Sequence, residues 1–544
     1  MGTKKSEARI FAENVCREYK GKPISDRALA KIVLEARPDL YKDFEKARYI
    51  INDIHDNRRG NKKRKEADLD LVKGKNANYV APELPEQYIE AQKRKHSKHS
   101  KCFFIPWAQN NTPVHLPLLE NIEAYAKFRQ AEIHVILGRY KNPNSVFSDK
   151  NYEVWDDVIM PYADANRHDL HKHLSLLSDI KIQPTAKMPL TGMEGISGLK
   201  SAIFGHPKVQ MTTIAALEGY LPKMLFTTGA CTLPNYTDSK AGKQGEFHHT
   251  FGFVVVEIKD NDVFFVRQVT ALKDGSFTDL FFNVKNGQIT EEKEIEAAIL
   301  GDIHIGEDCP LVNISQRKLL TKLKPKHTLI HDVLNGHSIS HHEEKDPIIQ
   351  FRRHKDGTNS LEREIEEMLT WIKGMKQFNL VFVASNHTDW LDRYIKSNDW
   401  KRNIHNAAMY MSCAAILLSG KASKGLVAYF IKESFGKDVK VLGRNDSFKV
   451  KGFQLAQHGD ISTNGSRGSV AGFKKLSTKM VIGHSHSPSR TDGVLSVGTS
   501  TKLRVEYNVG ASSWMNCDVI IHSNGKAQHV TYIGKNKEFT TIKF

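Results

Sequence analysis

Ala298-Ile299-Leu300-Gly301-Asp302-Ile303-His304 is the stretch around which the rest of the chain is best interpreted. Its apolar residues predict a short buried strand, and an aspartate and a histidine two residues apart follow at the end of that strand. Side chains two apart at the end of a strand point to the same side, so both can bind one cation. Because Asp-x-His is frequent in unrelated proteins, the metal-site interpretation depends on whether other strands end in the same way.

Four more apolar runs downstream end in the same kinds of polar residue. Helical patterns at 361–376 and 404–418 lie between them, so strands and helices alternate. In α/β sheets the ligand-binding residues gather at the carboxyl ends of the strands, and every one of these clusters falls there. The runs and their clusters are 328–330 with His331-Asp332, 380–384 with Ser385-Asn386-His387, 453–456 with His458-Gly459-Asp460, and 480–482 with Gly483-His484-Ser485-His486.

In this order and spacing, the clusters resemble the motifs of the calcineurin-like metallophosphoesterases, over about residues 296–544. The resemblance implies an α/β fold in which two sheets form a sandwich with a dinuclear metal centre. It also implies a role for each matching residue: Asp302, His304 and His486 would hold one metal, Asn386, His458 and His484 the other, and Asp332 would bridge them. His387 matches the family's catalytic histidine and would protonate the leaving oxygen or stabilise the transition state.

The implied cofactors are two divalent metal ions. Carboxylate, amide and imidazole donors suit manganese, iron or zinc, and we expect manganese. Two such cations ~3.5–4 Å apart polarise phosphoryl oxygens and lower the pKa of a bound water, which makes hydroxide available near neutral pH. The six cysteines, at positions 16, 102, 231, 309, 413 and 517, have no Cys-x-x-Cys spacing, which argues against a thiolate zinc site or a disulfide framework.

Two positions depart from the family pattern. Where a second acid usually follows the bridging aspartate, this chain has Asn335; where an acid usually follows the Asn-His pair, it has Thr388, with Asp389 one residue later. A catalytic imidazole depends on the partner of its other ring nitrogen. These changes leave the implied metal ligands intact and leave the orientation of His387 open.

The first part of the chain is predicted to be helical and basic. Hydrophobic spacing over 7–55, a Ser25-Asp26 cap and the break at Pro38 predict three helices in a helix-turn-helix-like unit. Such units bind DNA in some proteins and assemble subunits in others. Two basic blocks follow, at 58–65 and 93–101, and the formal charge of +17 with a pI near 9.3 favours a polyanionic partner.

We divide the chain into four segments. Residues 1–57 are predicted as the helical domain, 58–101 as a basic linker, 102–295 as an α/β accessory region and 296–544 as the metallophosphoesterase catalytic domain. Within the accessory region, 251–257 and 263–269 predict a hairpin, whereas 165–250 allows no assignment of elements.

Charge and the accessory segments select among the functions of the family, which include phosphomonoesterases, protein phosphatases and nucleases. The helical start, the basic blocks and the net charge favour a DNase that hydrolyses phosphodiester bonds. Candidate phosphate contacts near the second cluster are His337, His341, His342, Arg352 and Arg353. The alternatives are a phosphomonoesterase or protein phosphatase of the same fold, and a non-enzymatic DNA-tethering protein.

The basic chain with N-terminal additions and a C-terminal phosphoesterase also resembles the pre-early host-DNA-degrading proteins of large lytic coliphages. That resemblance implies a manganese-dependent DNase in the infected bacterial cytoplasm. No apolar run reaches the length of a membrane span, and the first residues lack the apolar core of a signal peptide. We therefore expect DNA rather than a membrane as the partner, and homo-oligomerisation stays open.

Overall fold

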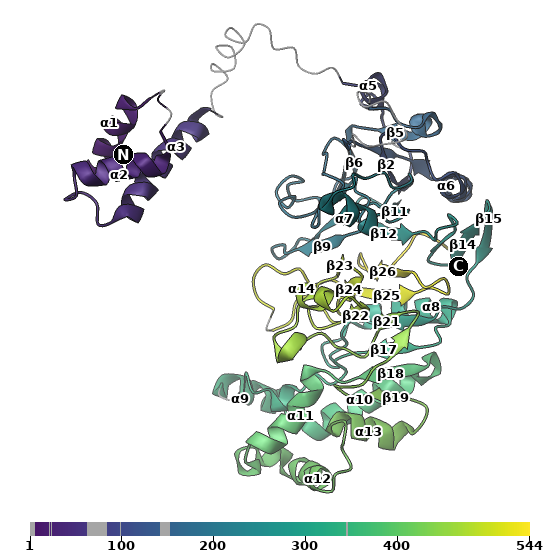
Figure 1. Ribbon diagram of the computed structural model, residues 1–544. Helices are drawn as coiled ribbons and strands as arrows, with labels where there is room; N and C mark the ends of the chain where they lie inside the picture. Colours follow the sequence, from purple (N-terminus) through teal and green to yellow (C-terminus); the bar gives the residue numbers. More distant parts are fainter. Residues whose placement is uncertain are drawn as a thin grey trace. The chain divides into compact units, whose positions relative to one another are not determined.

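The computed structural model describes residues 6–20, 22, 24–62, 84–97, 99–141, 153–343, 346–506 and 508–543, with the backbone alone for 55–62. The chain forms two compact units, Met1–Glu83 and Leu84–Phe544 (Figure 1). The described part of the first unit is helical, and every strand of the described residues belongs to the second.

The N-terminal unit is a bundle of three helices, α1 (Glu7–Glu18), α2 (Asp26–Ala36) and α3 (Phe44–Lys62). Ser25 caps α2 by accepting a hydrogen bond from the backbone N–H of Ala28 at 3.2 Å, and α2 ends two residues before Pro38. Apolar side chains from all three helices form a core of their own. The predicted small helical region at the N-terminus is confirmed.

The centre of the second unit is a six-stranded sheet, parallel over its first four strands. The order is β19 (Lys440–Leu442), β18 (Leu380–Val383), β17 (Thr328–Ile330), β16 (Ala297–Ile299), β25 (Cys517–Ile521) and β26 (Ala527–Thr531). Successive residues of the β16 stretch alternate between two cores, with Ala297 and Ile299 in one and Ala298 and Leu300 in the other. Since side chains alternate along a strand, this sheet is covered on both faces.

One face of this sheet is covered by a second sheet of ten strands. Val381 and Val383 of β18 share a buried cluster with Val481 and Leu495 of the second sheet. The order is β20 (Lys449–Val450), β21 (Phe453–Gln454), β22 (Lys479–Ile482), β24 (Val494–Ser496), β23 (Ser489–Thr491), β9 (Met211–Ile214), β10 (Lys223–Thr227), β8 (Ser201–Phe204), β7 (Leu174–Leu177) and β6 (Arg167–His171). The predicted site residues follow strands of both sheets.

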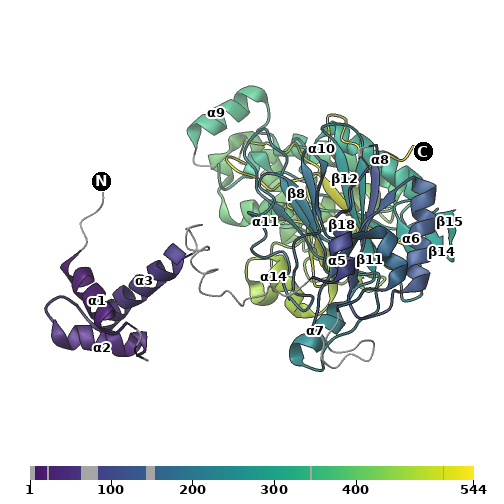
Figure 2. The ribbon, with the colours of Figure 1, turned by 90° about the horizontal axis from the view of Figure 1, so that it is seen from above.

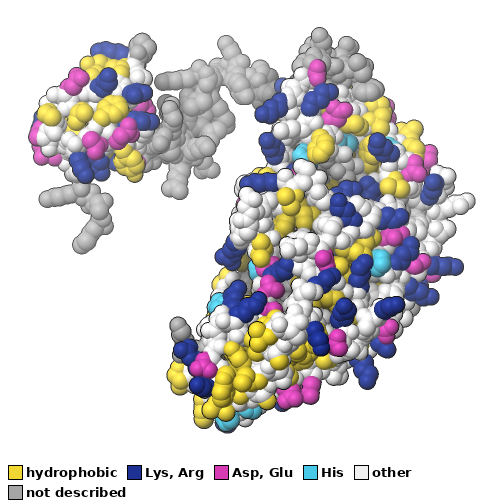
Figure 3. Space-filling model, turned by 60° about the horizontal axis from the view of Figure 1, so that its bottom comes forward, with side chains coloured by type: hydrophobic (Ala, Val, Ile, Leu, Met, Phe, Trp, Pro, Cys, Tyr) yellow, Lys and Arg dark blue, Asp and Glu magenta, His cyan; other side chains and the backbone are white. Residues whose placement is uncertain are grey.

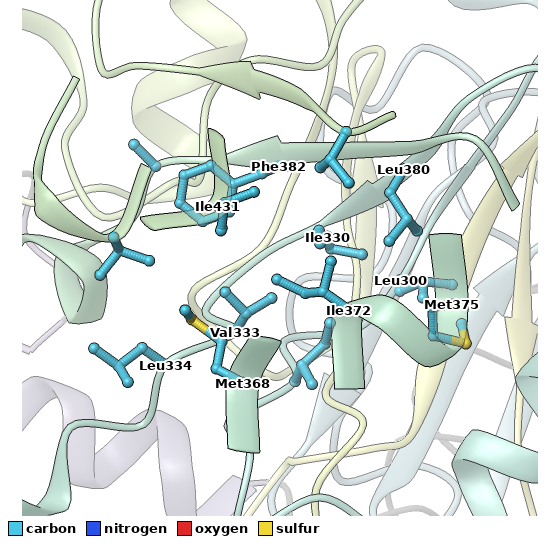
Figure 4. Packing of buried hydrophobic residues seen from close by; sticks show 14 of the residues in the cluster. Leu300, Ile330, Val333, Leu334, Met368, Ile372, Met375, Leu380, Phe382 and Ile431 are labelled. Carbon is cyan, nitrogen blue, oxygen red and sulfur yellow. The ribbon is translucent and has the colours of Figure 1, made fainter. Parts of the chain in front are cut away.

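Helices cover the other face of the six-stranded sheet. Figure 4 shows Met368, Ile372 and Met375 of the helix α10 (Leu361–Met375) facing Ile330 and Leu380 of the sheet. The other helices around this core are α8 (Pro310–Leu323), α11 (Asn386–Ser397), α12 (Ala407–Leu418) and α13 (Leu426–Phe435). The helices predicted at 361–376 and 404–418 are therefore present.

Three smaller sheets complete the second unit. They are β12 (Phe264–Thr270), β11 (Gly252–Ile258), β1 (Cys102–Ile105) and β3 (Glu132–Ile133); β2 (Trp107–Gln109), β4 (Val135–Gly138) and β5 (Ala163–Asp164); and β13 (Phe277–Asp279), β14 (Phe282–Lys285) and β15 (Gln288–Glu291). The predicted hairpin is confirmed, since β11 and β12 pair along their whole lengths.

The remaining α-helices of the described chain lie outside the central core. They are α5 (Glu86–Ala91), α6 (Leu116–Arg129), α7 (Lys240–His248), α9 (Pro347–Asp356) and α14 (Val470–Phe473). Figure 2 shows α6 and α8 on one side of the strands and α11 and α14 on the other. In Figure 1 the C-terminal strand β26 lies next to β12, and the two strands are in contact.

The region predicted as an accessory domain shares a sheet with the region predicted as catalytic. β9 pairs with β23 through Met211 and Arg490, so the strands β6 to β10 extend the sheet that contains β20 to β24. These five strands and α7 occupy the stretch 165–250 that the sequence pattern left unassigned. The predicted boundary after residue 295 falls in the loop before β16, inside one compact unit.

Candidate metal centre

Loops that follow strands of both sheets carry the predicted site residues. Asp302 and His304 follow β16, Asp332 follows β17, and Asn386 and His387 begin α11 after β18. His458 follows β21, and His484 and His486 follow β22.

Gly483 allows the loops after β16 and β22 to approach closely. A Cβ on this residue would lie 2.3 Å from Oδ1 of Asp302 and 3.2 Å from Nδ1 of His458. Any larger residue at this position would displace two of the predicted ligands, because real Cβ atoms do not approach other atoms that closely.

Asp302, His304, Asp332 and His486 form the first buried group, with one possible ligand atom from each within 4.8 Å of the others. Oδ2 of Asp302 lies 3.2 Å from Nε2 of His486 and accepts a hydrogen bond from the backbone N–H of His484 at 2.6 Å. Nε2 of His304 lies 3.1 Å from Nε2 of His486 and 3.7 Å from Oδ2 of Asp332. Four side chains from three loops therefore converge on one small volume.

Asp302, His331 and His458 form a second buried group beside the first. Nε2 of His458 lies 3.1 Å from Oδ2 of Asp332, and its Nδ1 lies 3.3 Å from Nδ1 of His331. Asp332 thus contacts histidines of both groups, which is the position that a bridging carboxylate requires.

Asn386 and His484 lie at the edge of this arrangement. The side-chain oxygen of Asn386 is buried without a hydrogen-bond partner among the described residues. The ring of His484 lies 5.4 Å from the ring of His458, measured between centroids, and is partly exposed. Of the imidazoles beside His458, His331 rather than His484 belongs to the second buried group.

Several buried polar atoms of the centre lack a hydrogen-bond partner within the described part of the chain. They are Asp302 Oδ1, Asp332 Oδ1, Asn386 Oδ1, His304 Nδ1, His458 Nε2 and His486 Nδ1. Each buried polar atom left unpaired costs about 1–3 kcal/mol. Carboxylate, amide and imidazole donors are also the ligands that manganese, iron and zinc accept. The residues present therefore fit the divalent metal ions that the resemblance implies.

Both carboxylates of the centre are held in their charged form. Burial alone would raise the pKa of Asp302, but the charges of His458 and His486 outweigh it and lower the pKa to about 2. The pKa of Asp332 lies well below its usual value because the charge of His458 outweighs the effect of burial. A carboxylate must be deprotonated to bind a cation, and a histidine must be neutral to do so. A bound cation would therefore take the place of the histidine protons as the partner of these carboxylates.

The backbone of the centre is strained. His304, Asp332, His484 and His486 have φ values of 48°, 44°, 69° and 54°, in the left-handed region that residues other than glycine seldom adopt. Such residues cost about 1–3 kcal/mol each and cluster at functional sites, where the surrounding structure holds them. Four of them among the predicted ligands indicate that ligand placement is maintained against a local cost in stability.

His387 is oriented by a backbone carbonyl rather than by an acid. Its Nδ1–H donates to the carbonyl oxygen of Asn335 at 2.8 Å. Its ring stacks on Trp390, with centroids 3.9 Å apart, and lies 4.5 Å from the ring of His304. Burial lowers the pKa of His387, which keeps the imidazole neutral near pH 7.

The second departure from the family pattern also has a structural role. Thr388 completes a capping box at the start of α11, because its hydroxyl accepts from the N–H of Ser385 and the Ser385 hydroxyl accepts from the N–H of Thr388. Asp389 pairs with Arg444, which also binds Asp460 through two bonds of 2.7 Å. This network ties the helix that begins with Asn386 and His387 to the loop of His458.

The predicted phosphate contacts divide into two kinds. Arg352 pairs with Glu506 at 2.6 Å, and Arg353 is buried against Glu343. His341 and His342 instead lie against Trp390, with centroid distances of 5.2 and 5.8 Å, on the aromatic surface that continues from His387. His337 contacts Glu307 at 3.2 Å. Residues 63–65 of the first basic block lie outside the described residues, as do the side chains of 58–62.

His331 is the residue of the centre that sequence reasoning missed. The family pattern assigned Asp332 and gave no role to the residue before it, and adjacent side chains on an extended strand would point to opposite faces. The left-handed backbone at Asp332, with φ of 44°, breaks this alternation and lets both side chains reach His458. The available signal was the imidazole itself, directly after a buried strand.

The chain is similar to a phage protein. It is 28% identical over 466 residues to Protein A1 of Escherichia phage T5, which covers 81% of this chain and 83% of that one. No protein-family model matches the chain. A crystal structure of Chaetomium thermophilum Vps29 aligns with 36% of this chain and 97% of its own, at 8% identity and a TM-score of 0.19, which is too low to support any argument about fold. Among the described helices, none is long and apolar enough to cross a membrane.

Proposed function

We propose that the chain is a two-metal phosphoesterase of the calcineurin-like type that hydrolyses DNA phosphodiester bonds. The observation that carries the proposal is the convergence of Asp302, His304, Asp332, His458 and His486 from the loops of two packed sheets. Their buried oxygen and nitrogen atoms include several without a hydrogen-bond partner among the described residues. A two-sheet sandwich with ligands at its strand ends is the arrangement that the family resemblance implies.

Each residue of the centre is assigned a role in binding the metals or in positioning the ligands. Asp302, His304 and His486 would hold one cation, Asn386 and His458 with His484 or His331 the other, and Asp332 would contact both. When bound, the two cations supply Lewis acidity toward the phosphoryl oxygens and lower the pKa of water. Gly483 lets the ligand loops close together, and the Arg444 network holds the loop of His458 in place.

His387 is the residue that we assign to proton exchange. Since its Nδ1–H is bonded to the carbonyl of Asn335, Nε2 is the ring atom that can exchange a proton with substrate or solvent. Trp390 restricts rotation of the ring by stacking on it. A positioned imidazole of this kind contributes ~10²–10⁴-fold to the rate of such reactions.

DNA is favoured as the substrate by the charge of the chain. The chain carries a formal charge of +17, and Figure 3 shows lysine and arginine side chains spread over the drawn face of the second unit rather than gathered in one patch. A distributed positive surface suits a long polyanion better than a small phosphomonoester. The similarity to a protein of Escherichia phage T5 is compatible with a phage hydrolase, and we propose host DNA in the infected bacterial cytoplasm as its substrate.

The test presents three substrates to the full chain: duplex DNA, single-stranded DNA and p-nitrophenyl phosphate, each with Mn²⁺ and with chelator. We expect DNA cleavage that requires Mn²⁺ and exceeds monoester hydrolysis, and loss of cleavage in the Asp332→Asn variant. Hydrolysis of the monoester alone would favour a phosphatase. Binding of DNA without hydrolysis of any substrate would favour a DNA-tethering protein.

A further inference from the structure

A second cluster of metal-binding side chains lies outside the candidate metal centre, at a junction between sheets. His134 is the residue between β3 and β4, where the chain leaves one small sheet and enters another. Asp164 ends β5 of the second of these sheets, and His168 lies in β6, the edge strand of the ten-stranded sheet. Three side chains from three sheets therefore meet at one point.

The three side chains are buried and in close contact. His134 and Asp164 are fully buried, and His168 is 6% exposed. Oδ2 of Asp164 lies 2.6 Å from Nδ1 of His134 and 2.8 Å from Nε2 of His168. The second of these contacts lacks hydrogen-bond geometry, so Nε2 of His168 is a buried nitrogen without a hydrogen-bond partner among the described residues. Nε2 of His458 and Oδ2 of Asp332 show the same kind of close contact at the metal centre.

Each histidine has a further group beside its other ring nitrogen. Nδ1 of His168 lies 3.4 Å from Nδ1 of His96, within hydrogen-bond geometry, whereas Nε2 of His134 lies 3.0 Å from Oε1 of Glu132 without hydrogen-bond geometry. Histidines that bind metals usually have such a partner, often a carboxylate, which fixes the ring and makes the ligating nitrogen more basic. Nδ1 of His134 and Nε2 of His168 are thereby left to face the carboxylate of Asp164 and one another.

We propose that His134, Asp164 and His168 form a structural metal site that binds zinc. Two imidazoles and one carboxylate are a donor set that zinc prefers, and no thiolate is needed. The fourth position of a tetrahedral ion falls to a water, because His96 lies beside the other ring nitrogen of His168. Because β3 and β5 are short and β6 is an edge strand, a metal at this point would join the borders of three sheets.

The competing arrangement needs no metal. A protonated His134 held between Glu132 and Asp164 would form an ion network at the same place, since burial lowers the pKa of His134 but the two carboxylates outweigh it and raise that pKa. The two arrangements differ in whether they bind Zn²⁺. A metal site would bind the ion, whereas the ion network would not.

The main experiment counts zinc in the full chain after equilibrium dialysis against Zn²⁺. His168→Gln removes one proposed ligand, and His171→Gln is the matched control, because His171 lies in the same strand, is 7% exposed, and has its Nε2 3.0 Å from the backbone carbonyl of Asp260. We expect His168→Gln to hold one zinc fewer per chain than the wild type and His171→Gln to hold the same number. Equal zinc in all three proteins would overturn the proposal in favour of the ion network.

A second measurement covers the case in which His168→Gln does not fold. The wild-type chain is stripped with chelator, saturated with Mn²⁺ to fill the catalytic centre, and then given Zn²⁺ while amide hydrogen exchange is followed. We expect zinc to slow exchange in 132–135 and 163–168. Unchanged exchange in both segments would contradict a metal site at this junction.

Discussion

Two pairs of buried carboxylates in the second unit are neutralised in different ways. Glu257 and Asp279 are both bonded to Arg267, whose guanidinium donates to their oxygens at 2.9 and 2.8 Å, and Arg129 adds a second cation. Asp302 and Asp332 are equally buried, but their ion-pair contacts among the described residues are with histidines alone.

The difference shows how a structural charge cluster can be told from a metal centre. A buried carboxylate is tolerated only with a compensating cation, and the first pair has one in its own chain. The second pair is surrounded by imidazoles, and some nitrogens of these imidazoles have no hydrogen-bond partner among the described residues. Several of the predicted ligands also have a left-handed backbone conformation. Both features are costly for a cluster that only stabilises the fold, and both suit one that binds cations.

The largest effect should come from the bridging carboxylate. We expect Asp332→Asn to lower Mn²⁺-dependent DNA hydrolysis by ~10³-fold or more, since the lost charge is one that holds two cations, each worth several kcal/mol in the transition state. Metal content measured by elemental analysis should fall while the circular dichroism spectrum is kept. Asp438→Asn, the same change at an exposed site, is the control. Full activity in folded Asp332→Asn would show that this carboxylate does not bridge.

Removing the imidazole at 387 separates chemistry from metal binding. We expect His387→Ala to keep its metals and to slow turnover by ~10²–10⁴-fold, the usual contribution of a positioned acid or base. His484→Ala should lose metal instead, and His405→Ala, at an exposed histidine, should change neither property. Equal metal loss in the first two variants would contradict the division between catalytic and ligand histidines.

The stability contributed by Glu257 and Asp279, the pair bonded to Arg267, should depend on pH and not on the presence of a chelator. Burial raises the pKa of Glu257 and Asp279, but Arg267 outweighs it and holds both below their usual values. Their contribution to stability is therefore present above the unfolded pKa of about 4 and is lost as the pH falls below it. We expect Arg267→Met to lower the free energy of unfolding by about 3–5 kcal/mol at pH 7, because it leaves buried charges unpaired.

The variant Arg267→Met should also reverse the pH dependence. With the guanidinium gone, protonation relieves the buried carboxylates, so the variant should regain stability on acidification while the wild type loses it. Denaturant unfolding at several pH values measures both slopes. The same loss of stability in both proteins on acidification would contradict the pairing.

Features set by residues close together in the sequence could be predicted, whereas contacts between residues distant in the chain could not. Asp302, His304 and His486 could be identified because each follows a buried strand within a few residues, and the helix at 361–375 from its apolar spacing. The pairing of Met211 with Arg490 could not be predicted, because nothing local in either strand specifies a partner so distant in the chain. The orientation of His387 by the carbonyl of Asn335 was likewise inaccessible, because any residue supplies a backbone carbonyl.

A smaller effect is expected at His331. For Nε2 of His458 to bind a metal, the proton must be on Nδ1, which then donates to Nδ1 of His331. His331→Leu removes this acceptor and should weaken metal binding by ~10–100-fold, as loss of an outer partner usually does. Asn places an oxygen near the same position, so His331→Asn should recover part of the affinity. Wild-type metal affinity in both variants would show that His331 serves packing alone. Loss of metal from both variants would show that His331 is itself a ligand.

The smallest effect on chemistry is expected from the first basic block, which we propose to supply affinity for DNA. Neutralising Arg58, Arg59, Lys62, Lys63, Arg64 and Lys65 removes up to six phosphate contacts, and each contact contributes ~0.9 to the slope of log affinity against log salt for duplex DNA. Not all six need touch phosphate together, so we expect the slope to fall by ~2–4.

Hydrolysis of a small phosphodiester should be unchanged by the same six substitutions, because the metal centre has its own ligands in the second unit. DNA affinity across a salt series and mass by light scattering, both on the neutralised variant, separate the two roles of this segment. An unchanged salt slope with an altered oligomer would show that the segment assembles subunits. DNA affinity would then have to come from the second unit, whose lysines and arginines are spread over the face drawn in Figure 3.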